Sequence, residues 1–248
     1  MKSINTEIYC PKNRMILVAV WAAVMVCAIL AYMPGLAGPF LFDDFGSIKP
    51  LGDFGGVTDW ESFKEFLLGG HAGPTGRPLA LLSFLVDGNG WPTDPWPFKR
   101  TNLLIHLITG TTLGILVTLV LKCIQIKRRD AQWIALVAAS IWILHPFLVS
   151  TTLYIVQRMA QLAALFMFAG LSLYLHGRLK TVTDPRRAYL TMSAAIAVFT
   201  LLATFSKENG LLLPVLVGVV ELTVVASQRD RLPALNRPWA IVFIAVPS

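Results

Sequence analysis

The chain has 248 residues, of which 55% are hydrophobic and only 14% are charged, and its mean hydropathy is +0.65. Because an ordinary soluble domain has roughly 25% charged residues, this composition excludes a soluble globular protein and indicates an integral membrane protein. The net charge of +7 does not indicate nucleic-acid binding, since the basic residues lie in short loops between apolar runs, as topology signals do. Three cysteines, Cys10, Cys27 and Cys123, lack the spacing of a zinc site or a disulfide framework.

The first apolar run follows a polar segment, residues 1–14, that we predict to be a cytoplasmic tail. Residues 15–34 are long enough to cross a hydrocarbon core of about 30 Å and form the predicted first span. A cleaved secretory signal is the alternative. The run exceeds the usual length of a signal core, and Pro39 crowds the only small-residue cleavage candidate, 36–38. We therefore expect an uncleaved span.

A long loop, residues 35–100, comes next and is rich in Gly, Pro, Trp and Asp. Segments 59–68 and 78–86 combine polar ends with apolar stripes, which predicts two short helices on the membrane interface. Asp59 is a suitable cap for the first of them. The tryptophan-rich segment 91–96 is typical of an interfacial aromatic anchor.

Further apolar runs predict the remaining spans, within residues 101–248 of a single membrane domain. A last apolar stretch, 239–246, is too short to cross a bilayer as a helix, so we expect the set to be incomplete at the C-terminus. The predicted fold class is an all-α polytopic membrane protein with about six transmembrane helices and a partial seventh. The internal runs are 103–121, 131–144, 153–175, 188–205 and 211–226.

The distribution of basic residues predicts the orientation of these spans. With alternating spans and a cytoplasmic N-terminus, 14 lysines and arginines fall on the cytoplasmic side and 7 on the other. The positive-inside rule therefore places the long loop outside the cytoplasm. The candidate site residues below all fall on this outer side.

Two adjacent carboxylates, Asp43 and Asp44, stand between aromatics where the first span ends. Ionisable groups at such positions are costly to desolvate and often mark substrate or ion sites. In an extended segment the two side chains point in opposite directions, so one can face a substrate while the other holds a partner. A carboxylate is the usual general base when a hydroxyl attacks a glycosyl donor. The alternative is an inert, solvated loop pair.

Cationic and imidazole side chains complete the candidate site. Arg77, before the predicted helix 78–86, is either a ligand for a carboxylate or phosphate or a snorkelling interfacial residue. His106 lies about two turns inside the second span, where it needs a partner and is either structural or substrate-binding. His145 precedes Pro146 at the end of the third span.

Arg158 is the single basic residue of its outer connection, and a cation at headgroup depth suits a lipid-linked phosphate. If the segment is helical, Tyr154, Arg158 and Gln161 share one face. Lys207 and Glu208 lie in a tight outer turn and form either a phosphate site or a local ion pair. Glu221 is expected to pair within the bundle.

Five short segments in this order resemble the transmembrane and tetratricopeptide-repeat (TMTC-type) protein O-mannosyltransferases and their bacterial relatives, polytopic glycosyltransferases of the GT-C class. The resemblance covers most of the chain. No tetratricopeptide repeat is present in these apolar segments. The segments are Phe42-Asp43-Asp44, Gly76-Arg77-Pro78-Leu79 with the following Leu-Ser-Phe, Asn102-Leu103-Leu104-Ile105-His106, His145-Pro146 with Gln157-Arg158 and 163–166, and 206–210.

The resemblance implies transfer of a sugar from a polyprenyl-phosphate donor to a protein or glycan acceptor on the extracytoplasmic face, in a bacterial inner membrane. It implies that Asp43 is the base, that Asp44 supports it, and that Arg158, with His145 or Lys207, binds the donor phosphate. Mg²⁺ or Mn²⁺ at the two aspartates is an option that two carboxylates alone do not define. The alternatives are a non-catalytic membrane scaffold of the same fold and a transporter, which would concentrate its charges near mid-bilayer.

Overall fold

The computed structural model describes residues 11–70, 72–73, 76–228 and 230–247, and all secondary structure among them is helical. Residues 1–10 of the predicted tail lie outside the described residues, as do Cys10 and Arg229. Five helices are long and apolar enough to cross a membrane, in agreement with the predicted class of α-helical polytopic membrane protein. These are Asn13–Ala37, Pro95–Cys123, Ile155–Arg178, Pro185–Ser206 and Glu208–Gln228.

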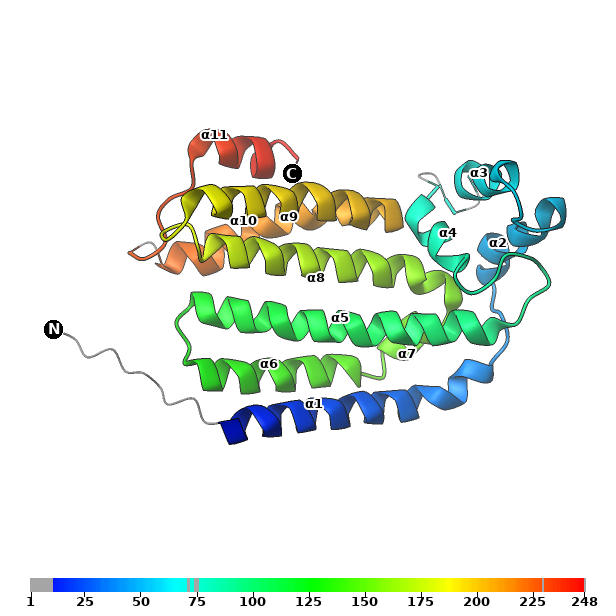
Figure 1. Cartoon of the computed structure of the whole chain (residues 1–248), viewed down its shortest axis with the longest axis horizontal. Helices are drawn as coiled ribbons and strands as arrows, with labels where there is room; N and C mark the ends of the chain where they lie inside the picture. The colour runs from blue at the N-terminus through cyan, green and yellow to red at the C-terminus, as the bar shows by residue number, and fades with distance from the viewer. Residues whose placement is uncertain (1–10, 71, 74–75, 229, 248) are drawn as a thin grey trace.

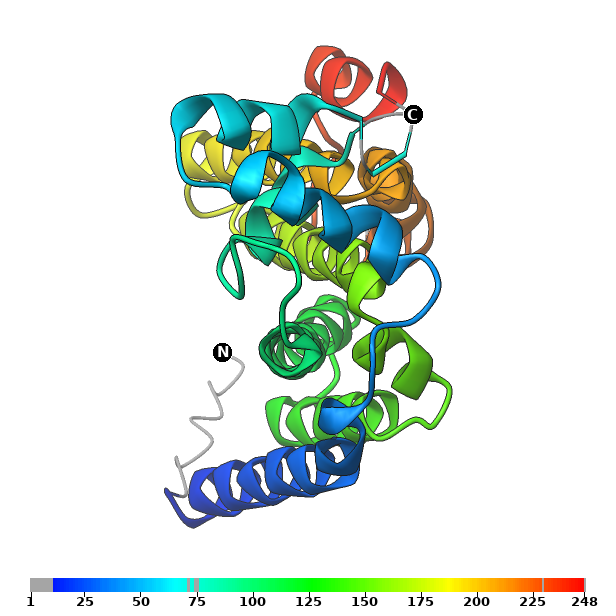
Figure 2. The same cartoon turned by 90° about the vertical axis from the view of Figure 1, so that its right-hand side faces the viewer.

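The long helices lie side by side in a row, with α1 at one edge and α11 at the other (Figures 1 and 2). From α1 the row continues through α6, α5 and α8 to α9 and α10. Consecutive long helices run in opposite directions, as the predicted alternation of spans requires. The bounds are α1 Pro11–Tyr32, α5 Pro95–Cys123, α6 Arg128–Ile143, α8 Arg158–Arg178, α9 Pro185–Ser206, α10 Leu213–Val220 and α11 Arg237–Ala240.

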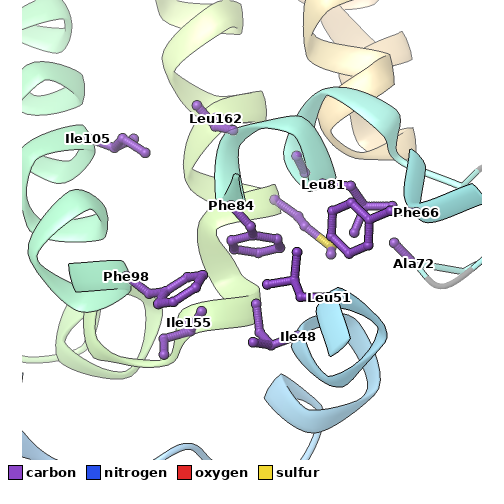
Figure 3. Packing of buried hydrophobic residues seen from close by; sticks show 12 residues of the cluster. Ile48, Leu51, Phe66, Ala72, Leu81, Phe84, Phe98, Ile105, Ile155 and Leu162 are labelled. Atoms are coloured by element: carbon purple, nitrogen blue, oxygen red, sulfur yellow. The ribbon is translucent and has the colours of Figure 1, made fainter. Parts of the chain in front are cut away.

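The segment between α1 and α5 folds over one end of the row, and we call residues 38–94 the cap (Figure 2). It contains α2 (Asp44–Ile48), α3 (Trp60–Leu68) and α4 (Pro78–Phe84). Cap residues such as Leu51 and Leu81 share one apolar core with Phe98 of α5 and Leu162 of α8 (Figure 3). The cap is therefore packed on the bundle.

Aspartate caps set the starts of several helices. Asp59 accepts from the backbone N–H groups of Glu61 and Ser62 at 3.0 and 2.8 Å, which confirms the predicted cap of α3. Asp94 caps α5, and Pro95 occupies the first helical position, where proline costs no hydrogen bond. The predicted loop 35–100 is therefore too long, because its last six residues already belong to α5.

The segment predicted as a third span is a shorter helix than expected. α6 has 16 residues, about 24 Å of helix, against roughly 30 Å of hydrocarbon. It ends because the residue before a proline, here His145, disfavours helical backbone. A short helix, α7 (Leu148–Leu153), follows at the cap end of the bundle. The predicted total of about six spans stays a prediction.

The interfacial assignments in the cap need correction at two places. α4 does not lie free on a membrane surface, because Ala80, Leu81 and Phe84 are fully buried in the shared core. Trp91 is not a simple aromatic anchor, since its ring packs against Phe40 at 5.2 Å between centroids. The apolar stripe of α4 covers protein, whereas Trp60 and Leu68 of α3 and Trp96 stay exposed, so the interfacial position of these residues stays a prediction.

Candidate functional site

The two adjacent aspartates at the end of the first span have different surroundings. Asp44 is fully buried, whereas Asp43 is exposed. The backbone of Asp43 is helical, with φ −72° and ψ −11°, so the expected extended segment is wrong. The expected divergence of the two side chains is nevertheless present, because successive residues of a helical turn project in different directions.

Asp44 joins the cap to the start of α8. Its Oδ2 accepts from the backbone N–H of Leu41 at 2.9 Å, and its Oδ1 accepts from the backbone N–H of Val156 at 2.8 Å. Val156 belongs to the 3-10 turn Ile155–Gln157 that leads into α8. The carboxylate therefore satisfies an N–H group at a helix start, which the helix itself leaves without a partner.

The electrostatics of Asp44 follow from this burial. Desolvation raises the pKa of the Asp44 carboxyl above its ordinary value, and the hydrogen bonds from Leu41 and Val156 and the positive charge of Lys99 oppose that rise. Lys99 is itself buried, in the first turns of α5. Asp44 thus serves as a structural anchor and is shielded from a substrate.

Asp43 is the carboxylate that a substrate can reach. Its backbone N–H donates to the hydroxyl of Tyr154 at 2.9 Å, across 111 residues of sequence. Burial, together with the two neighbouring carboxylates, raises the pKa of the Tyr154 hydroxyl. Phe42 precedes the pair with a left-handed backbone, φ 24°, and 85% of its surface exposed. Strained backbone of this kind is common at ligand sites.

The aspartates make a weak cation site by themselves. Both oxygens of Asp44 accept backbone N–H groups, which leaves Asp43 as the carboxylate open to a metal. Within the described part of the chain, no three His, Cys, Asp or Glu side chains gather as a metal centre. Hard cations such as Mg²⁺ take several oxygen ligands, and a substrate phosphate would have to supply the others.

Arg158 is the main correction to the predicted site. Its side chain is fully buried, and its Nη2 lies 2.6 Å from Oδ2 of Asp87, whose side chain is also fully buried. The guanidinium lies over the ring of Phe84 at 4.7 Å from the centroid. Its N–H groups donate to Asn102 Oδ1 at 2.7 Å and to the carbonyls of Ser83 and Phe98 at 2.8 and 2.7 Å. A guanidinium engaged in this way is part of the framework and does not bind the donor phosphate.

The expected common face of Tyr154, Arg158 and Gln161 is also wrong. Tyr154 has extended backbone and points its hydroxyl to Asp43, because α8 begins only after the 3-10 turn. Arg158 points into the core, and the Gln161 amide donates to the carbonyl of Thr151 at 2.7 Å. The three side chains serve three different contacts.

His106 is likewise a framework residue. It is buried, and its Nε2 lies 2.9 Å from the carbonyl of Ile143. Because a carbonyl oxygen only accepts, Nε2 carries the proton. The ring stacks on Trp142 with 4.9 Å between centroids. His106 thus caps the C-terminal end of α6, and its predicted role in substrate binding is wrong.

Arg77 and Glu208 form the second polar group at the cap end. Nε and Nη2 of Arg77 donate to the two carboxylate oxygens of Glu208, each at 3.0 Å, in a bidentate pair. The Arg77 side chain is 22% exposed, and its Nη1 contacts the sulfur of Met159 at 3.3 Å. Lys207 is half-buried and has no ion pair with any described carboxylate.

His145 and Glu221 lie at opposite ends of the bundle. His145 is exposed, and it lines an apolar groove of about 560 Å³ with Trp142 and Leu113, among others. Its Nδ1 accepts from the backbone N–H of Phe147 at 3.2 Å. Glu221 accepts from Tyr174 and Arg178 at 2.8 and 2.9 Å, which confirms the expected pairing within the bundle.

Sequence reasoning missed Asp87 and Lys99, the partners that neutralise the two buried charges. Asp87 lies in the turn Asp87-Gly88-Asn89-Gly90, which by composition is an ordinary surface turn. The sequence offers one signal for the role of Asp87, which is that Arg158 needs a carboxylate partner if it is buried.

Comparison with known protein families, with curated proteins and with solved structures finds no match for this chain.

The buried ion pair predicts a large loss of stability on removal of one partner. Asp87→Asn keeps the side-chain shape and removes the charge that neutralises Arg158, which typically costs about 3–5 kcal/mol. We expect that decrease in the free energy of unfolding, measured by denaturant titration in detergent micelles. Asp53→Asn, at an exposed carboxylate of the same cap, should stay within about 0.5 kcal/mol of the parent. Equal losses in both variants would contradict the assignment.

The raised pKa of Asp44 predicts a pH dependence of stability. The folded chain binds the proton of the Asp44 carboxyl more tightly than the unfolded chain does. Protonation of Asp44 therefore contributes fully to the free energy of unfolding below the ordinary aspartate pKa, and this contribution is lost as the pH rises through the raised folded pKa. The unfolding free energy of the parent, relative to Asp44→Asn, should therefore fall as the pH rises from about 3, below the ordinary aspartate pKa, through the raised folded pKa. Denaturant unfolding of both proteins across this range measures the difference, and a rise with pH would oppose the burial argument.

Proposed function

We propose that this chain is a membrane glycosyltransferase of the GT-C type, or the N-terminal catalytic half of one. It takes a sugar from a polyprenyl-phosphate donor and passes it to a hydroxyl of a protein or glycan acceptor. Asp43 is the general base. The observation that carries this proposal is the exposed carboxylate of Asp43 at the mouth of a span. The backbone N–H of this residue donates to the Tyr154 hydroxyl, and strained backbone at Phe42 precedes it.

The active face is the cap end, on the extracytoplasmic side of a bacterial inner membrane. Two features support this orientation. The end of the bundle opposite the cap carries basic clusters such as 127–129 and 186–187, and basic residues favour the cytoplasmic side. The cap instead carries eight of the fourteen acidic residues.

The donor phosphate binds beside Lys207, with Arg77 held in place by Glu208. Lys207 has no ion pair to a described carboxylate, so its ammonium group is available to a ligand. The charge of Arg158 is instead neutralised by its ion pair with Asp87. Tyr154 contacts Asp43, and Met159, five residues later, contacts Arg77. Both contacts are made at the start of α8 and in the 3-10 turn before it, so Asp43 and Arg77 lie at the same end of that helix.

The polyprenyl chain lies in the apolar groove that α5, α6 and the segment 145–148 form. Since Nδ1 of His145 accepts a backbone N–H, the neutral ring carries its proton on Nε2 and can donate to a polar group at the mouth of this groove. His145 thus stays in the substrate-binding set. The walls are apolar side chains such as Ile141 and Leu113, which suit an isoprenoid.

Asp43→Asn is expected to lower sugar transfer about 10²–10⁴-fold, because the neutral amide cannot accept the proton of the attacking hydroxyl. The measurement is transfer of a labelled sugar from polyprenyl-phosphate donors to acceptor peptides and glycans in proteoliposomes, with unfolding curves to confirm the fold. Asp53→Asn removes an exposed cap carboxylate and should leave transfer unchanged. Full activity in Asp43→Asn would refute the base assignment. A parent chain without transfer from any donor would favour the non-catalytic scaffold.

Filling the groove is expected to weaken binding of long donors. Ala138→Trp places a large ring in the groove and should raise the KM for a long-chain donor roughly tenfold, as loss of two buried methylenes at about 0.8 kcal/mol each would. Val137→Trp adds the same ring at an adjacent exposed position that does not line the groove, and serves as the matched control. A short-chain donor should be indifferent to both variants. An unchanged long-chain KM in Ala138→Trp would rule out the groove.

A further inference from the structure

A second groove lies near the end of the bundle opposite the cap, where α1 crosses α5 and α6. It has a volume of about 430 Å³, and its lining includes Arg14, Val18 and Trp21 of α1, Thr118 of α5 and Gln132 of α6. The proposed transfer reaction takes place at the other end and makes no use of this groove.

The wall that α5 contributes is effectively apolar. The hydroxyls of Thr111 and Thr118 donate to the carbonyls of Leu107 and Gly114 in their own helix, each at 2.8 Å. Neither hydroxyl therefore has a proton left for a ligand in the groove. A wall of this kind suits an alkyl chain and offers no free hydroxyl for a polar ligand.

The position of α1 opens the groove to the bilayer. α1 lies at the edge of the helix row (Figures 1 and 2). Only 11% of its apolar window is buried inside the protein. The remaining surface has to face lipid, and a lipid tail can enter the groove sideways from the membrane.

The charge at the groove selects among lipids. Arg14 is exposed at its mouth and makes no ion pair with any described carboxylate. Lys127 and Arg129 stand at the start of α6, with Asp130 as the one acidic neighbour in that turn. Arginine binds phosphate oxygens in bidentate fashion, and basic pockets between spans on the cytoplasmic side favour anionic headgroups.

We propose that this groove binds an anionic phospholipid of the bilayer, with one acyl chain between α1 and the α5–α6 pair and its phosphate on Arg14. The lipid fills the gap beside the thinly packed first span and so holds α1 against the bundle. This proposal does not rest on the transfer reaction and holds for a scaffold as well.

The test measures lipid retention by native mass spectrometry of the full chain in detergent with added dioleoyl phosphatidylglycerol or dioleoyl phosphatidylcholine. The parent chain should retain phosphatidylglycerol in preference. Arg14→Gln should lower that preference about fivefold, the usual contribution of one basic residue near an anionic lipid surface. Arg186→Gln removes another exposed arginine at the same end, away from the groove, and should leave the preference unchanged.

A second pair of variants separates the groove from the charge. Val18→Trp fills the groove and keeps Arg14, so it should reduce retention of phosphatidylglycerol, whereas Val26→Trp on the exposed surface of α1 should not. Equal retention of the two lipids by the parent chain would show ordinary boundary lipid and overturn the proposal. So would an unchanged preference in Arg14→Gln. A dimer without bound lipid would assign the groove to a second copy of this chain.

Discussion

The position of the cap depends on one buried cation. Arg158 begins α8, and its guanidinium contacts the Ser83 carbonyl and Asp87 from the cap together with Asn102 and the Phe98 carbonyl from α5. A fully desolvated guanidinium is tolerated only where an anion neutralises it and its N–H groups have partners. The cap must therefore dock in one arrangement for this charge to be satisfied. Apolar burial alone would allow neighbouring arrangements.

The same helix start also positions the proposed base. Asp44 accepts the N–H of Val156, two residues before Arg158, so the loop after the first span and the rest of the cap are fixed at one point of the bundle. With Asp44 buried, Asp43 is turned outward and held through its backbone by Tyr154. The buried residue of the pair supplies the rigidity, and the exposed residue is free for chemistry. This division is what a preorganised base requires.

The sequence predicted what depends on local pattern and failed where a distant partner decides. Apolar runs located the long helices, and Asp59 located the start of α3, because these signals lie within a few residues. Arg158 looked like a phosphate ligand because its carboxylate partner lies in a remote turn of the cap. His106 was placed correctly inside a span, but its hydrogen bond to the end of α6 depends on how two helices pack. Whether a charged side chain is buried depends on tertiary packing, and this burial distinguishes structural residues such as Arg158 from residues that a ligand can reach.

The distribution of charge distinguishes the two lipid sites that we propose. At the cap end, Asp87 and Asp44 offset the buried charges of Arg158 and Lys99. The cations that remain for the proposed donor phosphate are Lys207 and Arg77, which is paired with Glu208. At the opposite end, the exposed Arg14 lines the α1 groove, and the first turn of α6 carries one acidic residue, Asp130. The proposed base at the cap end is Asp43, an exposed carboxylate beside buried Asp44, and acceptor deprotonation needs such a base together with a cation for the donor phosphate.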